Sequence, residues 1–294
     1  AIDPAELRLN IVAKPDSLTA SWLRIGTIGL AECIRKVVEL SDWKNRFRKL
    51  QAGRGLGLAC GAYMCGAGVS VYWNKMPHSG VQLLLDRSGQ VTVFCGATEI
   101  GQGSDTVLAM LVAEVLGIDP DDVRCMTGDT AITPIDLGSY SSRVTVMMGN
   151  AAVQAAERVR ALIADAAGEK LEVRAQSIVF SRGRVYAAQE PNKGMSFVEA
   201  VAYAEAKFGT LGSVGSYAPA KPPGRFKGAG VGPSPAYSFT ACVVEVEVDP
   251  STGLIHVPKV WIAHDIGRTI NPVLARGQVI GSVYMGLGEA LMEE

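Results

Sequence analysis

Residues 236–265 hold the pattern that most restricts how this chain can fold. The stretch VEVEV at 244–248 alternates valine with glutamate, which is the period of a β-strand with two different faces. The tetrapeptide PSTG at 250–253 supplies a turn, and another apolar run follows it. The segment is therefore predicted to form a β-hairpin, in which neighbouring strands run antiparallel.

Similar signals place further hairpins and helices along the chain. Hairpins are predicted at 81–95 and 177–187, and a short strand at 122–126. Helices are predicted at 106–116, 144–167 and 196–208, and another opens at Asn271-Pro272. Hairpins beside helices, without a regular alternation of strand and helix, indicate an α+β fold.

The segment 27–43 is predicted to be an amphipathic helix. Thr27 is its expected cap, and the residues expected on its apolar face are Leu30, Ile34, Val37 and Val38. Such a helix packs against a core through one stripe of side chains.

The charge and the cysteine pattern exclude several classes of protein. A formal net charge of -1 gives no electrostatic footprint for nucleic acid. The six cysteines show no CxxC spacing and the chain has only three histidines, so no zinc or iron–sulfur ligand set is predicted. No run approaches the roughly 20 apolar residues of a membrane span. We therefore expect a cytoplasmic protein with reduced thiols and neither membrane nor nucleic acid as a partner.

The stretch CGATEIGQGSDT at 95–106 places Gln102 between Gly101 and Gly103, just before a predicted helix. The first N–H groups of a helix lack intrahelical partners and attract anions such as phosphate. Flanking glycines allow close approach of the backbone, and the Gln102 amide can donate and accept. The stretch lacks the third glycine of the dinucleotide fingerprint. It is interpreted either as a binding loop for a phosphate-bearing ligand or as a turn whose glutamine faces water.

A second candidate stretch, GSYSSRVTVMMGNAA, begins at Gly138 and leads into the long helix. Its hydroxyls and the helix N–H groups would form another anion site. The alternative is ordinary N-capping by Ser141 or Ser142. Arg143 is expected to pair with a phosphate or with a surface carboxylate.

A third candidate stretch runs from His264 to Gly288. Asp265 precedes a glycine bend, and Gln278 lies about two turns into the helix that opens at Asn271. Small residues after Gln278 suggest a close approach by a ligand, and tight packing of a core helix is the alternative. His264 is interpreted as a core or edge histidine rather than a metal ligand.

These stretches, in order, resemble one family. GATEIGQGSDT, DTAITPIDLGSYSSRVTVMMGNAA, VEVEVDPSTG and HDIGRTINPVLARGQVIGSVYMGLGEALMEE are similar to the molybdenum-binding subunit of the xanthine dehydrogenase/aldehyde oxidase family. The resemblance covers nearly the whole chain. Within the family, GSYSSRVT and YWNKMPHS are most similar to the large (alpha) subunit of 4-hydroxybenzoyl-CoA reductase. The resemblance implies molybdenum held by a molybdopterin cofactor, commonly the cytosine dinucleotide in bacteria.

The resemblance implies cofactor-binding roles for eight residues of this chain. The GQG residues would contact the pterin and phosphate part, the residues before the long helix would line the metal and phosphate side, and the glutamine after Asn-Pro would also reach the cofactor. These residues are Gly101, Gln102, Gly103, Tyr140, Ser141, Ser142, Val144 and Gln278. The chain departs from the usual family residues at Ser141 and Val144. Because most members give the metal no protein ligand, no metal ligand is expected here.

The resemblance also implies parts that lie outside this chain. The family's catalytic base is a glutamate on a GAKG-type segment, expected beyond Glu294, so no catalytic residue is predicted within the chain. A GGGFGG-type segment is expected before its start. The chain is therefore interpreted as a fragment that is inactive alone. Its expected partners are the remainder of the large subunit, an iron–sulfur subunit and an FAD subunit.

Three segments are predicted from these arguments. They are an N-terminal helical segment at 1–50, a first cofactor-binding subdomain at 51–215, and the truncated start of a second at 216–294. A hairpin followed by a helix with Gly-Gln occurs twice, at 81–116 and 242–291, which suggests two related subdomains. The Pro/Gly-rich stretch 216–235 is either a linker or a surface loop.

The predicted function is the cofactor-binding portion of a molybdenum-dependent oxidoreductase. Its specific activity is expected to be reductive dehydroxylation of an aromatic acyl-CoA. Tyr72 and Trp73 are candidate ring contacts, and packing in the core or at an interface is the alternative for them. Hydroxylation of an aldehyde, purine or heteroaromatic compound is the alternative, and a non-catalytic nucleotide-binding module is another. A phosphate hydrolase would need clustered carboxylates and a divalent ion, whereas the candidates Asp129, Asp136 and Asp265 are isolated in the sequence.

Overall fold

A computed structural model of the chain describes residues 2–20, 22, 24–66, 79–219, 234 and 236–293. It divides the chain into two compact units. Unit 1 comprises Ala1–Cys65 together with Lys221–Glu294, and unit 2 comprises Gly66–Ala220. The α+β class predicted from the sequence is confirmed, since hairpins and helices occur in both units. The division differs from the three predicted segments because the start of the chain groups with its end.

Unit 1 is built on an antiparallel sheet in the order β12-β11-β3. Its strands are β3 (Arg54–Cys65), β11 (Ala236–Val248) and β12 (Ile255–Asp265). β11 and β12 form the predicted hairpin. β3 pairs along the other side of β11, with Cys65 opposite Ala236. This pairing joins residues 54–65, near the start of the chain, to the strands near its end, and so places both parts in unit 1.

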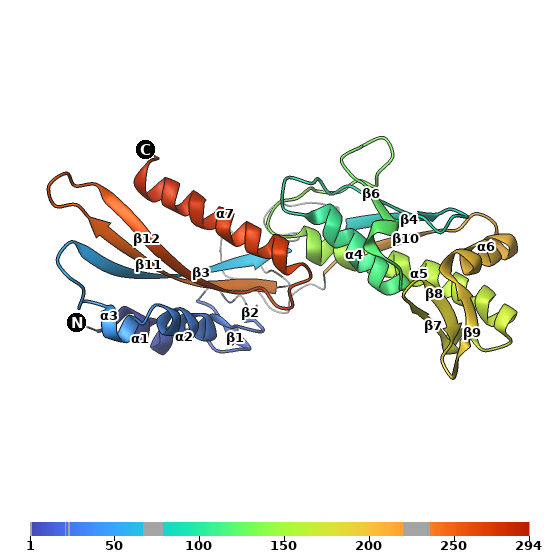
Figure 1. Cartoon of the computed structure of the whole chain (residues 1–294), viewed down its shortest axis with the longest axis horizontal. Helices are drawn as coiled ribbons and strands as arrows, with labels where there is room; N and C mark the ends of the chain where they lie inside the picture. The colour runs from blue at the N-terminus through green and yellow to red at the C-terminus, as the bar shows by residue number, and fades with distance from the viewer. Residues whose placement is uncertain are drawn as a thin grey trace. The chain divides into compact units, whose positions relative to one another are not determined.

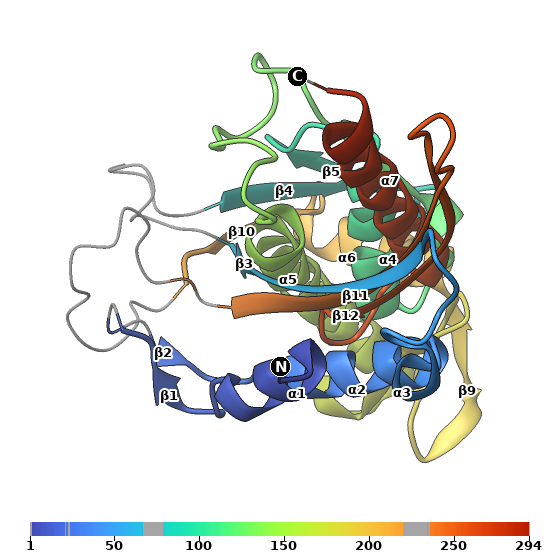
Figure 2. The same cartoon turned by 90° about the vertical axis from the view of Figure 1, so that its left-hand side faces the viewer.

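Helices cover both faces of this sheet (Figures 1 and 2). On one face lie α1 (Pro4–Ile11), α2 (Leu30–Leu40) and α3 (Trp43–Arg46), and over the other lies α7 (Pro272–Leu291). A two-stranded hairpin, β1 (Ser17–Leu18) with β2 (Arg24–Ile25), joins α1 to α2. The core of unit 1 forms between α2 and the sheet, where Ile34 and Val37 pack with Ala241 and Val243. An apolar cavity of about 430 Å³ separates the valine-lined face of β11 and β12 from α7.

The predicted helix at 27–43 is shorter in the structure, and Thr27 does not cap it. α2 begins after Gly29, whose N–H donates to Asp265 Oδ2 at 2.8 Å. The helix ends at Leu40, and Asp42 takes a left-handed conformation with φ 51° before α3. The predicted apolar face is confirmed, because Ile34 and Val37 are fully buried.

Glu245 shows which face of β11 is buried. The predicted alternation is present, but the face that carries Glu245 is the one that packs on α2, alongside Ala241 and Val243. Arg46 and Arg54 each donate to Glu245 Oε1 at 2.7 Å. Hydrogen bonding from Arg46 lowers the pKa of Glu245 below its ordinary value. Ion pairing therefore allows a glutamate in a buried strand position.

Unit 2 contains a sheet in the order β10-β4-β5-β6. Its strands are β4 (Ser79–Leu85), β5 (Val91–Cys95), β6 (Val123–Met126) and β10 (Gly212–Tyr217). β4 and β5 form the predicted hairpin, and β6 runs parallel to β5. The helices α4 (Ser104–Leu116) and α5 (Val144–Leu171) pack together and α5 contacts the sheet (Figure 1). A 3₁₀ turn, η1 (Pro120–Asp122), leads from α4 to β6.

The rest of unit 2 is a smaller sheet with its own helix. β7 (Ile178–Ser181), β8 (Arg184–Ala187) and β9 (Glu190–Ser196) follow a second 3₁₀ turn, η2 (Ala175–Ser177). They lead into α6 (Phe197–Phe208), which starts with a capping box between Ser196 and Glu199. The hairpin predicted at 177–187 and the helices predicted at 106–116, 144–167 and 196–208 are all present.

Small residues let α5 lie against the sheet of unit 2. Seven of its fifteen buried residues are alanine and two are glycine. Gly215 of β10 faces the backbone of α5. A Cβ added at Gly215 would lie 1.9 Å from the carbonyl oxygen of Ala151. The contact therefore depends on the absence of a side chain at this strand position. No helix of the described residues is long and apolar enough to span a membrane.

Candidate cofactor-binding site

The loop between β5 and α4 folds around the carboxylate of Glu99. Glu99 Oε1 accepts from the N–H groups of Gly101 at 2.8 Å and Gly103 at 2.9 Å. Glu99 Oε2 accepts from Asp105 N at 3.1 Å and Ser104 Oγ at 3.3 Å. The N-cap residue of α4 is Gly103, which has no side chain with which to cap. Glu99 therefore satisfies donors at the helix start that would otherwise lack partners.

The hydrogen bonds to Glu99 also favour its charged form. Partial burial alone would raise the pKa of Glu99, but hydrogen bonds from the backbone of Gly103, Asp105 and Gly101 outweigh burial and lower the pKa. Asp105 lies beside this carboxylate in the first turn of α4. Burial raises the pKa of Asp105, a hydrogen bond from Thr127 opposes the rise, and the charge of Glu99 adds to it. The start of α4 thus already holds two acidic side chains.

Gln102 turns back into the same loop. Its Oε1 accepts from Ile100 N at 2.7 Å, and its Nε2 donates to Thr98 O at 3.1 Å and Ser104 Oγ at 3.0 Å. Gln102 is therefore held by its own loop, an arrangement that suits a plain turn as well as a binding loop. A contact of Gln102 with a cofactor stays a prediction.

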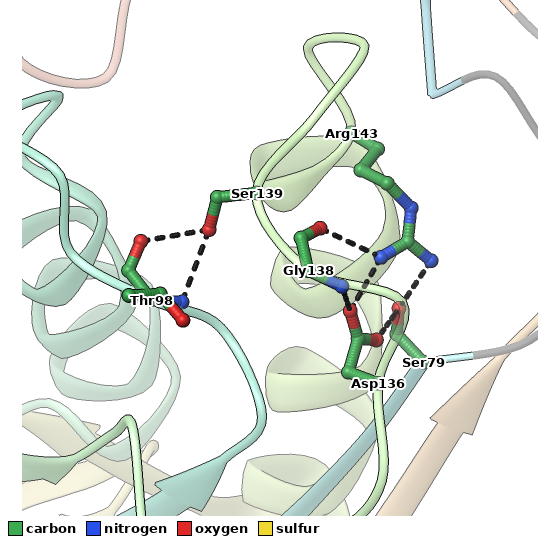
Figure 3. Close-up of polar contacts among 6 residues, drawn as sticks. All are labelled: Ser79, Thr98, Asp136, Gly138, Ser139 and Arg143. Carbon is green, nitrogen blue, oxygen red and sulfur yellow. Dashed lines mark hydrogen bonds and ion pairs between the residues drawn. The ribbon is translucent and has the colours of Figure 1, made fainter.

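Ser139 joins this loop to the segment before α5 (Figure 3). Its Oγ accepts from Thr98 N at 3.0 Å and donates to Thr98 O at 2.7 Å. Thr98 precedes Glu99 directly, and Ser139 precedes Tyr140. Two of the three candidate stretches therefore touch through a single side chain.

A buried ion pair fixes the same segment from its other side. Arg143 contacts Asp136, and both side chains are almost completely buried. Arg143 also donates to Gly138 O and to Ser79 Oγ, each at 3.0 Å. Ser79 Oγ donates to Asp136, and Asp136 accepts from Gly138 N at 2.8 Å (Figure 3). Arg143 therefore pairs with a buried carboxylate, so the surface carboxylate expected as one alternative is wrong, while pairing with a phosphate stays a prediction.

Gly96 allows this segment to pass close to the end of β5. A Cβ at Gly96 would lie 2.5 Å from the carbonyl oxygen of Pro134 and 2.7 Å from Cβ of Asp136. Distances this short are incompatible with a side chain. Glycine is therefore needed where the two segments that meet at Ser139 begin to converge.

The residues before α5 do not cap it in the usual way. The N-cap is Arg143, and no side chain among the described residues caps the helix start. Ser141 and Ser142 take left-handed conformations with φ 55° and 48°. The alternative in which Ser141 or Ser142 caps the helix is therefore wrong. The side chain of Val144 is buried in the unit 2 core, whereas Ser142 is exposed.

Replacing Ser139 with alanine is expected to loosen the connection to Thr98. Two hydrogen bonds are lost, and the expected destabilisation is about 1–3 kcal/mol because each bond is worth about 0.5–1.5 kcal/mol net. Urea unfolding measures the loss, and amide hydrogen exchange at Thr98 should become faster. Ser213→Ala is the control, since Ser213 Oγ donates to Ala155 O at 2.7 Å elsewhere in unit 2. Equal exchange at Thr98 in both variants would contradict the proposed connection.

The third candidate stretch belongs to unit 1. Asn271 caps α7 through a hydrogen bond to Leu274 N at 3.0 Å, and Gln278 is exposed on that helix. Asp265 binds Gly29 N. His264 Nδ1 lies 2.6 Å from Thr240 Oγ1, and burial lowers the pKa of His264. Because Gln278 lies in unit 1 and Gln102 in unit 2, their convergence on one ligand stays a prediction.

The carboxylates and thiols of the described residues form no metal site. No group of three or more His, Cys, Asp or Glu side chains gathers in the part of the chain that the structure describes. Asp129 closes a local turn, while Asp136 and Asp265 have the partners given above. Burial raises the pKa of Cys95 to about 11 and that of Cys125 to about 12. These arrangements give no support to the divalent-ion hydrolase.

Residues 34–294 match the family described as the molybdopterin cofactor-binding domain. The match covers most of the chain, including the joined loops of unit 2 and the α7 segment.

The chain belongs to this family.

Similar proteins extend the comparison. The chain is 32% identical to the xanthine dehydrogenase molybdenum-binding subunit of Escherichia coli O157:H7 over 100% of its own length and 38% of that protein. It is 33% identical to the gamma subunit of the 6-hydroxypseudooxynicotine dehydrogenase complex of Paenarthrobacter nicotinovorans, over 88% of this chain and 31% of that protein. Quinoline 2-oxidoreductase of Pseudomonas putida 86 matches in structure with a TM-score of 0.79 and 26% identity, over 95% of this chain and 36% of that one. The chain thus spans less than two fifths of these relatives.

The structure of this molybdopterin domain shows several contacts that the sequence alone does not predict. Glu99 and Ser139 lie inside the candidate stretches, but the sequence alone predicts no individual role for either residue. A glycine at the N-cap with a glutamate four residues upstream is a pattern from which the capping role of Glu99 could be predicted. The joining of Thr98 to Ser139 bridges forty-one positions, and no local pattern predicts such a contact. Tyr72 and Trp73 lie outside the described residues, as does nearly all of YWNKMPHS.

Proposed function

We propose that this chain forms part of the molybdopterin site of a molybdenum-dependent oxidoreductase. The family match over residues 34–294 carries the proposal. The eight predicted residues remain its cofactor-binding candidates: Gly101, Gln102, Gly103, Tyr140, Ser141, Ser142, Val144 and Gln278. When bound, the molybdenum would supply the redox chemistry, and the protein would bind and orient the cofactor.

The start of α5 offers donors that suit an anionic cofactor. No acidic residue lies in its first turn, and no side chain of the described part caps it. A helix start without a neutralising carboxylate keeps a partial positive charge. Ser142 is exposed beside it and Ser141 is half-exposed. Hydroxyl groups and backbone N–H groups together fit a diphosphate, and they support the predicted roles of these two serines.

The whole enzyme is proposed to be a multisubunit complex. The relatives include proteins named as a gamma subunit and as a large subunit. An iron–sulfur subunit, an FAD subunit and the remainder of the large subunit are the proposed partners. The catalytic glutamate is proposed to lie outside residues 1–294, and the cofactor is proposed to be the cytosine dinucleotide form.

Two substrate classes are proposed for test. The relatives include proteins named for xanthine, nicotine, quinoline and aldehyde, which favours oxidation of a nitrogen heterocycle or an aldehyde. Reductive dehydroxylation of an aromatic acyl-CoA is the other class, and GSYSSRVT supports it.

The function is tested on the complete subunit purified from a host that makes molybdopterin. Molybdenum measured by mass spectrometry should be stoichiometric with the subunit, and acid treatment should release a cytosine nucleotide. A purified protein without molybdenum would refute the proposal. Two activity assays then separate the substrate classes. Oxidation of a heteroaromatic compound or an aldehyde would support the first class, and reduction of 4-hydroxybenzoyl-CoA by a low-potential electron donor would support the second.

Replacing Gln102 with alanine in the complete subunit is expected to reduce molybdenum content. The change removes hydrogen bonds worth about 0.5–1.5 kcal/mol each, which corresponds to about a 2- to 10-fold weaker retention of the cofactor. Gln82→Ala is the matched control, because Gln82 is an exposed glutamine of β4 in the same unit. Equal molybdenum content in the two variants would remove Gln102 from the site.

A further inference from the structure

Glu99 already occupies the helix start to which a phosphate would be expected to bind. Its two oxygens accept four hydrogen bonds, from Gly101 N, Gly103 N, Ser104 Oγ and Asp105 N. Each backbone N–H has one hydrogen to donate. An anion from outside could use these donors only after displacing the glutamate.

The glycines of the GQG sequence have a role in this arrangement. Gly101 and Gly103 have φ values of +97° and +80°, which other residues rarely adopt. A Cβ at Gly101 would meet nothing within 4 Å. The backbone conformation is therefore sufficient to favour glycine at 101, because no protein atom crowds this position. The positive φ values turn successive N–H groups toward the Glu99 carboxylate.

The charges at this helix start oppose a second anion. Glu99 is held in its charged form by the hydrogen bonds above, and Asp105 adds another carboxyl group within the first turn. A diphosphate placed here would face like charges at short range. The first turn of α5 contains no acidic residue, and no side chain of the described residues caps this helix.

The position of Glu99 also links it to the rest of the site. The neighbouring residue, Thr98, is bound on both its N–H and its carbonyl by Ser139. Ser104 is shared, since its hydroxyl contacts both Glu99 and Gln102. A change in how Glu99 is bound would therefore be transmitted to Gln102 and to the segment that carries Tyr140 and Ser141.

We propose that Glu99 is a positioning residue for molybdopterin: it acts as an internal anion that shapes residues 98–105, and the cofactor's diphosphate is received elsewhere. This inference rests on the proposed function. It assigns the GQG loop to the uncharged part of the cofactor. It also predicts that the negative charge of Glu99 promotes cofactor binding, although the cofactor is itself an anion.

The test compares two substitutions in the complete subunit. Glu99→Gln keeps the shape of the side chain, but places an NH₂ group where Oε2 now accepts from Asp105 N. Glu99→Asp keeps the charge and shortens the side chain. We expect cofactor content, measured as molybdenum and as fluorescent oxidised pterin, to fall about three- to tenfold in Glu99→Gln and by less in Glu99→Asp.

Glu199→Gln is the matched control. Glu199 also accepts hydrogen bonds at a helix start of unit 2, from Ser196 N and Ser196 Oγ, both at 2.8 Å. The two glutamine variants should lose similar thermal stability, but only Glu99→Gln should lose cofactor. If the Glu99→Gln protein does not accumulate in a folded form, Ser104→Ala replaces it in the test. This variant removes one donor to the Glu99 carboxylate and is expected to give a smaller loss of cofactor.

Other outcomes overturn the inference. Equal cofactor content in Glu99→Gln and Glu199→Gln would show that the Glu99 charge is not needed. A higher cofactor content in Glu99→Gln than in the unaltered protein, or tighter binding of inorganic pyrophosphate by its cofactor-free form, would make Glu99 a placeholder that the diphosphate displaces. An unaltered protein without molybdenum would instead refute the proposed function itself.

Discussion

Replacing Arg143 with alanine is expected to lower the free energy of unfolding by about 3–5 kcal/mol, because one half of a buried ion pair is removed and the other half remains. The side chain of Asp136 is completely buried and that of Arg143 is 1% exposed. Without Arg143, the carboxylate would keep only Ser79 and the N–H of Gly138 as partners. Asp136 would then be a buried carboxylate without a cation beside it.

Chemical unfolding measures the free energy of unfolding of Arg143→Ala, and the same change at a matched, exposed arginine is the control. Arg87 pairs with Glu205 at 2.7 Å in the same unit, but its side chain is 74% exposed. Exposed pairs contribute about 0–1 kcal/mol, so Arg87→Ala should have little effect. Arg143→Lys should recover part of the loss, since it restores the charge but not the several donors of the guanidinium group. A similar cost for Arg143→Ala and Arg87→Ala would contradict the buried pair.

Replacing Gly215 with alanine is expected to destabilise the protein by about 3 kcal/mol, the upper part of the usual range for an over-packed interior. The new methyl group would overlap the carbonyl oxygen of Ala151 at 1.9 Å and lie 2.8 Å from Ala155 N. Both atoms belong to the backbone of α5, which cannot move aside as a flexible side chain can. Either α5 must shift away from β10 or the strand must leave the sheet.

Thermal unfolding followed by circular dichroism should show a lower midpoint for Gly215→Ala. Gly61→Ala is the control, because Gly61 also lies within a strand and a Cβ there would meet nothing within 4 Å. Alanine also has less conformational entropy than glycine in the unfolded chain, so the control is expected to be neutral or slightly stabilising. Equal midpoints for the two variants would contradict the close contact of β10 with α5.

The elements that were predictable are those fixed by nearby residues. The hairpin from Val81 to Cys95 has its turn residues between two alternating runs, and α6 has both members of its capping box, Ser196 and Glu199, in the sequence. Asn271 also caps α7 as the Asn-Pro pair indicates. In each case the partner that satisfies the backbone lies within a few residues. Local patterns are sufficient under that condition.

The elements that were missed depend on distant partners. Thr27 is a reasonable cap in the sequence, but Asp265 binds the N–H of Gly29 from the other end of the chain. Glu245 looks like a solvent-facing residue in an alternating strand until Arg46 and Arg54 are brought beside it. The pairing of β3 with β11 has no local signal either. Tertiary contacts decided these positions against the local preference.

The candidate site shows the same division. The sequence identified the three stretches and the residue types that suit a phosphate-bearing ligand. It did not show that Glu99 takes the donors of α4, because a nearby carboxylate and an external phosphate compete for the same N–H groups. The choice between the two depends on how the loop turns at Gly101 and Gly103, which only the structure reveals.

The pairing of β3 with β11 has a consequence for biosynthesis. β3 is translated before the whole of unit 2, and its partner strand is translated after it, since Cys65 pairs with Ala236. A nascent chain would therefore carry β3 with unsatisfied edge groups while the intervening unit emerges from the ribosome and folds. Its twelve residues therefore remain open to a chaperone throughout the synthesis of unit 2.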